Sequence, residues 1–184
     1  MVDSELIKAV KSQNQAAFKQ MYEKCIRYIY AIVKRYVTNE SDYQDLIQEI
    51  FARVFLKIES FEESKGDFKY WLRRLAINEC LQHCRKLNSG GKIVSLKSVA
   101  HFESEETVEL NGFSKKELAQ YLGNMPDGYK QIFMLSVIDD YSHQEIAQQL
   151  DISPETSRSQ LSRAKKWLKD NLSNNNLKKL ANGF

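Results

Sequence analysis

This sequence has little proline and glycine and no long apolar run. Its 184 residues include two prolines and seven glycines, while 42% of the residues are apolar. A β-sandwich needs many tight turns, which are rich in proline and glycine, so this composition favours an all-α fold. The N-terminus is polar and the apolar runs span only a few residues, which argues against a signal peptide and a membrane span. We therefore expect an all-α protein without membrane insertion.

The chain has three cysteines, an odd number that does not suit a disulfide framework. Together with the lack of a secretory signal, this count predicts a protein of the reducing cytoplasm. Cys80 and Cys84 lie four residues apart with His83 beside them, which is part of a possible zinc site. Zinc needs about four ligands, however, and His101 and His143 are isolated in the sequence. We expect the cysteines to be buried as small apolar side chains and predict no metal or cofactor.

The net charge of +3 is small, but the charged residues are unevenly distributed. Residues 1–87 contain 15 basic and 12 acidic residues, and residues 113–184 contain 10 and 8. Residues 88–112 contain two basic and four acidic residues, and Gly90 and Gly91 there would break a helix. The sequence therefore predicts two small helical domains, 1–87 and 113–184, joined by a flexible linker over 88–112. A structured loop that docks elsewhere is the alternative.

Residues 1–87 contain three long amphipathic segments, at about 17–37, 42–58 and 68–87. Their apolar residues recur at helical spacing, and the connections between them are short, as in a helical bundle that buries its own core. The middle segment leaves acidic and amide side chains on its outer side: Asp42, Asp45, Gln48 and Glu49. This face is either solvated surface or a docking site for a basic protein partner.

The third segment carries basic residues interleaved with aromatic ones. Its outer face is expected to hold Lys69, Arg73, Arg74 and Asn78, with Tyr70 and Trp71 at its start. Cationic side chains bind a phosphate backbone and aromatic rings stack on unpaired bases, so this combination is typical of a surface for single-stranded nucleic acid. A solvated basic face is the alternative.

Two short helices joined by a tight turn are predicted after residue 141. Ser142 and Glu145 form a capping box for the first helix, and Ser153 caps the second, which begins at Pro154. On the second helix, Ser157, Leu161, Ala164 and Leu168 share a packing side opposite Arg158, Ser159, Ser162 and Arg163. Arginine binds guanine edges or phosphates and serine binds either, so the pair predicts a DNA-binding helix-turn-helix. An ordinary helical hairpin is the alternative.

Taken together, the two halves resemble the bacterial RNA polymerase sigma factors of the extracytoplasmic-function group over nearly the whole chain. The N-terminal half is similar to that family's second conserved region through Asp42–Phe51, Phe61 and Trp71–Asn78. The C-terminal half is similar to its fourth region through Met125-Pro126, Ile132-Phe133, Tyr141-Ser142, Glu145–Ala147, Leu150, Ile152-Ser153, Thr156 and Arg163-Ala164. Each motif is weak alone, but two regions in this order with a variable linker are specific.

The resemblance implies that these surfaces act in transcription initiation. Asp45, Gln48 and Glu49 match the helix that docks on the clamp helices of the polymerase β′ subunit. The loop 62–67 and Asn78 match the pocket for a base flipped from the minus-ten element. The minus-ten surface implied in this way consists of Ser64, Lys65, Lys69, Trp71, Arg73, Arg74 and Asn78. The residues that match the readers of the minus-thirty-five element are Thr156, Arg158, Ser159, Ser162 and Arg163.

By the same resemblance, the chain is expected to contact the flap of the β subunit and to be controlled by an anti-sigma factor. It departs from the family pattern at Tyr43, where a small residue is usual, and at Ser157, which replaces a common valine or isoleucine on the packing side. A homodimeric helix-turn-helix regulator that acts without polymerase is the alternative function. An enzyme is not expected, because the sequence has no nucleophile–base pair, Gly-rich phosphate loop or metal cluster.

Overall fold

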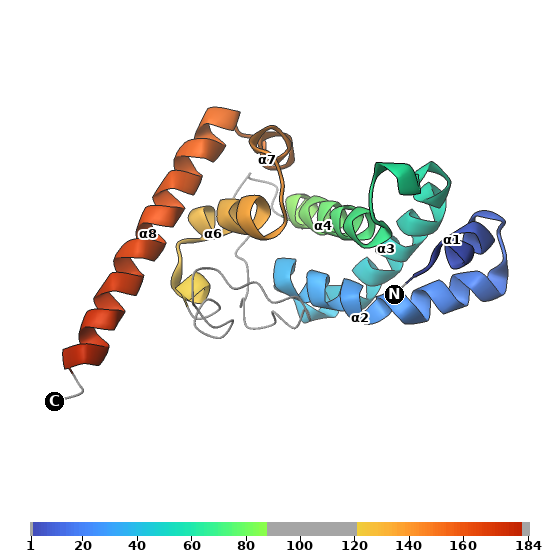
Figure 1. Cartoon of the computed structure of the whole chain (residues 1–184), viewed down its shortest axis with the longest axis horizontal. Helices are drawn as coiled ribbons and strands as arrows, with labels where there is room; N and C mark the ends of the chain where they lie inside the picture. Colours follow the sequence, from blue (N-terminus) through green and yellow to red (C-terminus); the bar gives the residue numbers. More distant parts are fainter. Residues whose placement is uncertain (1, 88–120, 182–184) are drawn as a thin grey trace. The chain divides into compact units, whose positions relative to one another are not determined.

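A computed structural model describes residues 2–87 and 121–181, with side chains as far as Asn171. Every regular element in these ranges is a helix, and the chain divides into two compact units, Met1–Ser89 and Gly90–Phe184 (Figure 1). The predicted all-α class with two helical domains is thus confirmed. The predicted linker, 88–112, lies outside the described residues. Among the residues that are described, no helix combines the length and apolar character needed to cross a bilayer.

Residues 2–87 form a bundle of α1 (Ser4–Lys11), α2 (Gln15–Tyr36), α3 (Tyr43–Lys57) and α4 (Phe68–Leu87). The three long helices pack against one another in pairs, and α1 packs on α2 (Figure 1). Their apolar stripes meet in one core, whose fully buried members include Met21, Ile29, Val33, Ile50, Val54, Ala76, Ile77 and Cys80. The predicted helices agree with these bounds to within two residues.

Short polar side chains determine where the first two helices begin. Asp3 Oδ1 accepts a hydrogen bond from the backbone N–H of Leu6 at 2.8 Å, and Asn14 Oδ1 accepts one from Ala17 at 3.0 Å. Each cap satisfies an N–H group that has no partner within its helix. The 3₁₀ turns η1 (Glu40–Asp42), η2 (Ile58–Ser60) and η3 (Glu63–Lys65) then shape the two connections around α3. These connections are therefore short and internally hydrogen-bonded.

The second unit contains α6 (Asp127–Phe133), a π-helical turn η5 (Met134–Ile138), α7 (His143–Leu150) and α8 (Pro154–Ala181) (Figure 1). α8 packs against both α6 and α7. On α8 the predicted packing side is buried at Ser157, Leu161 and Ala164 and half-buried at Leu168. The helix-turn-helix pair is therefore α7 and α8.

The caps of this pair are those that the sequence predicts. Ser142 Oγ accepts from the N–H of Glu145 at 3.2 Å, and the Glu145 carboxylate accepts from the N–H of Ser142 at 2.9 Å. Asp151 ends α7 in the left-handed conformation, with φ of 53°. Ser153 Oγ then accepts from the N–H of Thr156 at 3.1 Å, at the start of α8. These local bonds set the sharp turn between the two helices.

Candidate nucleic-acid interface and docking helix

The predicted docking residues lie together on the exposed side of α3. Asp45, Gln48 and Glu49 are exposed, while Leu46, Ile50 and Val54 on the opposite side are buried in the bundle core. At 100° per residue, Leu56 falls on the same exposed side, about two to three turns further along the helix. Leu56 is 76% exposed, more than any other large apolar residue in the described part of the chain. The face thus combines acidic, amide and apolar groups.

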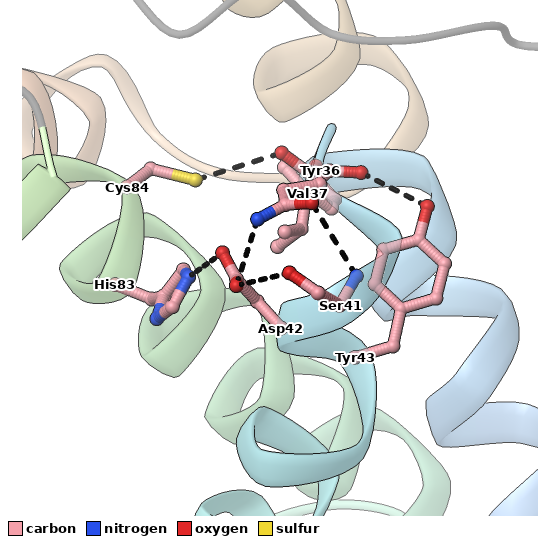
Figure 2. Close-up of polar contacts among 8 residues, drawn as sticks. Tyr36, Val37, Ser41, Asp42, Tyr43, His83 and Cys84 are labelled. Atoms are coloured by element: carbon pink, nitrogen blue, oxygen red, sulfur yellow. Dashed lines mark hydrogen bonds and ion pairs between the residues drawn. The ribbon is translucent and has the colours of Figure 1, made fainter.

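A network of hydrogen bonds around Asp42 holds the start of α3 (Figure 2). Asp42 Oδ1 accepts from Asn39 Nδ2 at 2.9 Å and from Ser41 Oγ at 3.1 Å, and Asp42 Oδ2 lies 3.1 Å from His83 Nε2. A carboxylate can only accept, so His83 must carry its proton on Nε2. The bond joins η1 to the last turns of α4, 41 positions away in the sequence. Helix α3 is therefore fixed to the bundle at its N-terminal end.

Two further bonds in Figure 2 attach the end of α2 to the same region. Tyr43 donates its hydroxyl to the carbonyl of Val37 at 3.2 Å, and Cys84 Sγ donates to the carbonyl of Tyr36 at 3.6 Å. Burial is the main cause that raises the pKa of the Tyr43 hydroxyl, and the negative charge of Glu40 and the Tyr30 hydroxyl raise it further. Tyr43, which departs from the family pattern, thus closes the turn between α2 and α3 through its hydroxyl.

Beside the docking face lies a groove of about 400 Å³ between α2 and α3. Three tyrosines, two isoleucines and three polar residues line it: Tyr22, Tyr30, Tyr43, Ile26, Ile47, Glu40, Gln44 and Gln48. Tyr22 and Tyr30 are 40% and 44% exposed. The sequence reasoning did not identify this groove, although the four-residue spacing of Tyr22, Ile26 and Tyr30 places them on one side of a helix.

The predicted minus-ten residues of α4 are half-buried rather than fully exposed. Lys69 places its ammonium 5.8 Å from the ring centroid of Tyr28, and Arg74 donates to the Tyr70 hydroxyl at 2.9 Å. Trp71 packs against both Phe61 and Phe68, with ring centroids 5.4 and 5.6 Å away. Arg73 and Asn78 are also half-buried. The structure therefore brings the predicted cations and aromatic rings together and adds Tyr28 from α2, which the sequence analysis did not single out.

The loop before α4 carries the remaining predicted minus-ten residues, Ser64 and Lys65, both exposed. Lys65 pairs with Glu62 at 2.7 Å, so it is already bound to a carboxylate of its own loop. Helix α1 also holds this part of the chain in place through two hydrogen bonds. Ser4 Oγ donates to Glu63 Oε2 at 2.8 Å, and Lys11 Nζ donates to the carbonyl of Phe61 at 2.6 Å. Nothing in the local sequence pattern of α1 pointed to these contacts.

The predicted minus-thirty-five residues lie along the first three turns of α8. Arg158, Ser159, Ser162 and Arg163 are exposed and Thr156 is half-buried. Arg158 donates to Glu155 Oε1 at 2.6 Å, and Ser159 Oγ donates to the carbonyl of Thr156 at 3.0 Å. The pKa of Glu155 is lowered, first by the hydrogen bond from its own backbone N–H, and further by the Ser153 hydroxyl and by Arg158. The exposed side of α8 thus presents two guanidinium groups and two hydroxyls.

All three cysteines are buried, as predicted. Burial raises the pKa of the Cys25 and Cys84 thiols to about 11, and it raises the pKa of Cys80 further. A thiol reacts as a nucleophile only after losing its proton, so these buried thiols are unreactive at neutral pH. Among the described residues, no group of three or more His, Cys, Asp or Glu side chains is placed to hold a metal ion. The cysteines therefore serve as small apolar side chains of the core.

Two protein-family models and several known proteins match this chain. The family model of sigma-70 region 2 matches residues 21–89, and that of sigma-70 region 4 matches residues 115–168. The chain is 26% identical to the ECF RNA polymerase sigma factor SigW of Bacillus subtilis, over 94% of this chain and 97% of that protein. It is 24% identical to the ECF RNA polymerase sigma-E factor of Escherichia coli K12, over 90% and 91% of the two chains. Among solved structures, the sigma factor RpoE of Bartonella quintana, in complex with the anti-sigma factor NepR, is 18% identical to this chain. The match covers 85% of this chain and 96% of that chain, with a TM-score of 0.48.

The two matched regions occur in the expected order, and each falls within one of the two compact units. Helix α7 and the first half of α8 lie in the region 4 match, and α3 and α4 lie in the region 2 match. The chain belongs to the RNA polymerase sigma factors of the extracytoplasmic-function group. Such a factor acts in transcription initiation, where it binds core RNA polymerase and promoter DNA.

Proposed function

We propose that this sigma factor divides promoter recognition and polymerase binding among three separate surfaces. The proposal depends above all on the exposed side of α8, where two arginines and two serines follow a capped helix start. In a helix-turn-helix, this side enters the major groove, where such groups bind base edges and phosphates. Arg158, Ser159, Ser162 and Arg163, with Thr156 at the helix start, are then the readers of the minus-thirty-five element.

The exposed side of α3 is the proposed polymerase surface. Asp45, Gln48 and Glu49 are exposed together, and Leu56 adds a solvated apolar group on the same side. An exposed apolar side chain next to acidic ones suits a partner helix that offers both apolar and basic groups, such as the clamp helices of the β′ subunit. The Asp42 network supports this role because it keeps α3 in place before the partner arrives.

The loop 62–67 and the first turns of α4 form the proposed minus-ten surface. Unpairing promoter DNA costs several kcal/mol, and stacking on aromatic rings returns about 1–3 kcal/mol per base. The Lys69–Tyr28 and Arg74–Tyr70 contacts place cations over tyrosine rings at this surface, which is the combination that a single strand needs. Ser64, Lys65 and Asn78 complete it, and the amide of Asn78 would pair with the edge of a flipped base.

The remaining parts of the proposal follow from membership of the group. We propose domains over 1–87 and 113–184 with the linker over 88–112, contact with the flap of the β subunit, and control by an anti-sigma factor. The protein would act in the bacterial cytoplasm, and it would have no catalytic activity of its own. Its effect on transcription would come from the affinities of its surfaces, because two weak DNA contacts reinforce each other when the polymerase links them.

In vitro transcription with purified core RNA polymerase tests this function. Core enzyme with the chain should transcribe a set of promoter fragments from the source genome and protect both promoter elements in footprinting. Core enzyme alone, on the same fragments, is the control. A palindromic footprint by the chain alone, with no effect on core enzyme, would instead indicate a homodimeric regulator and would refute the proposal.

A further inference from the structure

The helix-turn-helix contains a partly buried polar contact that links its two helices. His143 Nδ1 of α7 lies 2.8 Å from Ser157 Oγ of α8. Ser157 is 0% exposed, so its hydroxyl has no contact with solvent in this structure. The hydroxyl can donate to an unprotonated Nδ1 or accept from a protonated one, so the bond forms in either state.

Because Ser157 lies near the start of α8, this bond restricts the rotation of α8 about its own axis. Ser157 lies one turn into the helix, on the side opposite Ser159 and Ser162. A hydrogen bond holds distance and angle within narrow limits, whereas contacts between apolar side chains tolerate sliding. Side-chain tips lie about 5–6 Å from a helix axis, so a rotation of about 10° moves each tip by about 1 Å. That displacement is enough to spoil a bidentate contact with a base edge.

We propose that His143 and Ser157 are positioning residues that fix the rotation of α8 and thereby set which base sequence the helix reads. The inference rests on the proposed function of α8 as the minus-thirty-five reader. It assigns sequence selectivity to two side chains that face away from the DNA-facing side. Affinity for the phosphate backbone depends on charge and tolerates a small rotation, so it does not depend on this pair.

Four variants separate positioning from simple stability. Ser157→Ala and His143→Leu each remove the bond, and the double variant removes both partners. His143→Asn keeps a hydrogen-bonding atom near the place of Nδ1. Ile146→Val is the matched control, because Ile146 is a fully buried residue of α7 outside the pair. His143 is only half-buried, so its variants keep the test possible even if Ser157→Ala fails to fold.

The experiment uses holoenzyme reconstituted from the full chain and core RNA polymerase. Wild-type holoenzyme first selects its preferred upstream motif from a pool of randomised duplexes. The affinity of each variant is then measured for the selected duplex and for a scrambled duplex of equal length. We expect Ser157→Ala and His143→Leu to lower the ratio of these affinities at least tenfold, through binding to the selected duplex alone. The double variant should match the single ones, and His143→Asn should recover most of the ratio.

Three results would overturn the inference. The ratio could stay within twofold of wild type in both single variants. Ile146→Val could lower it as much as they do, which would show an effect of stability alone. Binding to the scrambled duplex could fall in parallel, which would show loss of the fold or of phosphate contacts. If wild-type holoenzyme selects no motif at all, the proposed function fails and this inference fails with it. A clear motif that the variants read equally well overturns the inference alone.

Discussion

Replacing Asp42 with alanine should destabilise the first unit without touching its core. The carboxylate accepts hydrogen bonds from Asn39, Ser41 and His83, at 2.9, 3.1 and 3.1 Å. Each such bond contributes about 0.5–1.5 kcal/mol net, and the Asp42 side chain is 22% exposed, so water replaces part of the loss. We therefore expect Asp42→Ala to lower the free energy of unfolding of this unit by about 2 kcal/mol. The melting temperature should fall by roughly 10 °C, as is usual for a domain of this size.

Urea unfolding followed by the fluorescence of Trp71 measures this loss. The chain has two tryptophans, so the experiment uses a Trp167→Phe background in which the signal comes from the aromatic cluster of Phe61, Phe68 and Trp71. Asp45→Ala is the matched control, because Asp45 is an exposed carboxylate in the first turn of α3, three residues after Asp42. It should change the free energy by less than about 0.5 kcal/mol.

A double-mutant cycle with His83→Ala isolates the bond between η1 and α4. The coupling energy of Asp42 and His83 should be about 1 kcal/mol, since their bond is one of three made by the carboxylate. Equal losses in Asp42→Ala and Asp45→Ala, or a coupling energy of zero, would show that the network does not hold α3 in place.

Three further results are expected. Gln48→Ala combined with Glu49→Lys should abolish pull-down of core RNA polymerase while thermal melting stays unchanged, since both side chains are exposed; unchanged pull-down would refute the docking role. Asn78→Ala should impair promoter melting and minus-ten discrimination, whereas Arg163→Ala should weaken binding to the minus-thirty-five duplex by about 1–3 kcal/mol; equal effects on both elements would refute the division of labour. Because burial raises the pKa of the Cys25 thiol from 9.0 to about 11, the unfolded chain loses that proton first, so stability should be constant below pH 9 and fall between pH 9 and 11. Only the Cys25 share of this fall is at issue, since Cys84 titrates similarly; urea unfolding across this range should show a smaller fall in Cys25→Ala, and equal slopes would contradict the argument.

The sequence predicted the helices well because their signals are local. The bounds of α4 and the caps at Ser142 and Ser153 follow from residues within one or two turns of each other. The same is true of the exposed sides of α3 and α8, which follow from helical periodicity. Side chains on these sides could therefore be assigned from the spacing of apolar and polar residues.

The contacts that shape the sites join residues far apart in the chain, so the local spacing of apolar and polar residues does not predict them. Lys11 with Phe61 and Asp42 with His83 are such pairs, separated by 50 and 41 positions. The sequence places Ser157 on the packing side of its helix and shows His143 as an isolated histidine, but it does not indicate that the two are partners. Packing in three dimensions decides which polar groups meet, so the sequence alone could not pair them.

The ion pair between Arg158 and Glu155 has a consequence for how DNA binding depends on salt. When a cationic side chain neutralises a phosphate, the salt dependence counts the small ions set free from the DNA. Before binding, Arg158 is already neutralised by a carboxylate one turn away, at 2.6 Å. On binding a DNA phosphate, Arg158 would leave the Glu155 carboxylate, which would then attract a cation from solution. This uptake of a cation at Glu155 would cancel part of the release of cations from the DNA. The affinity for DNA would therefore fall less steeply with salt than the number of basic side chains in contact with phosphates predicts.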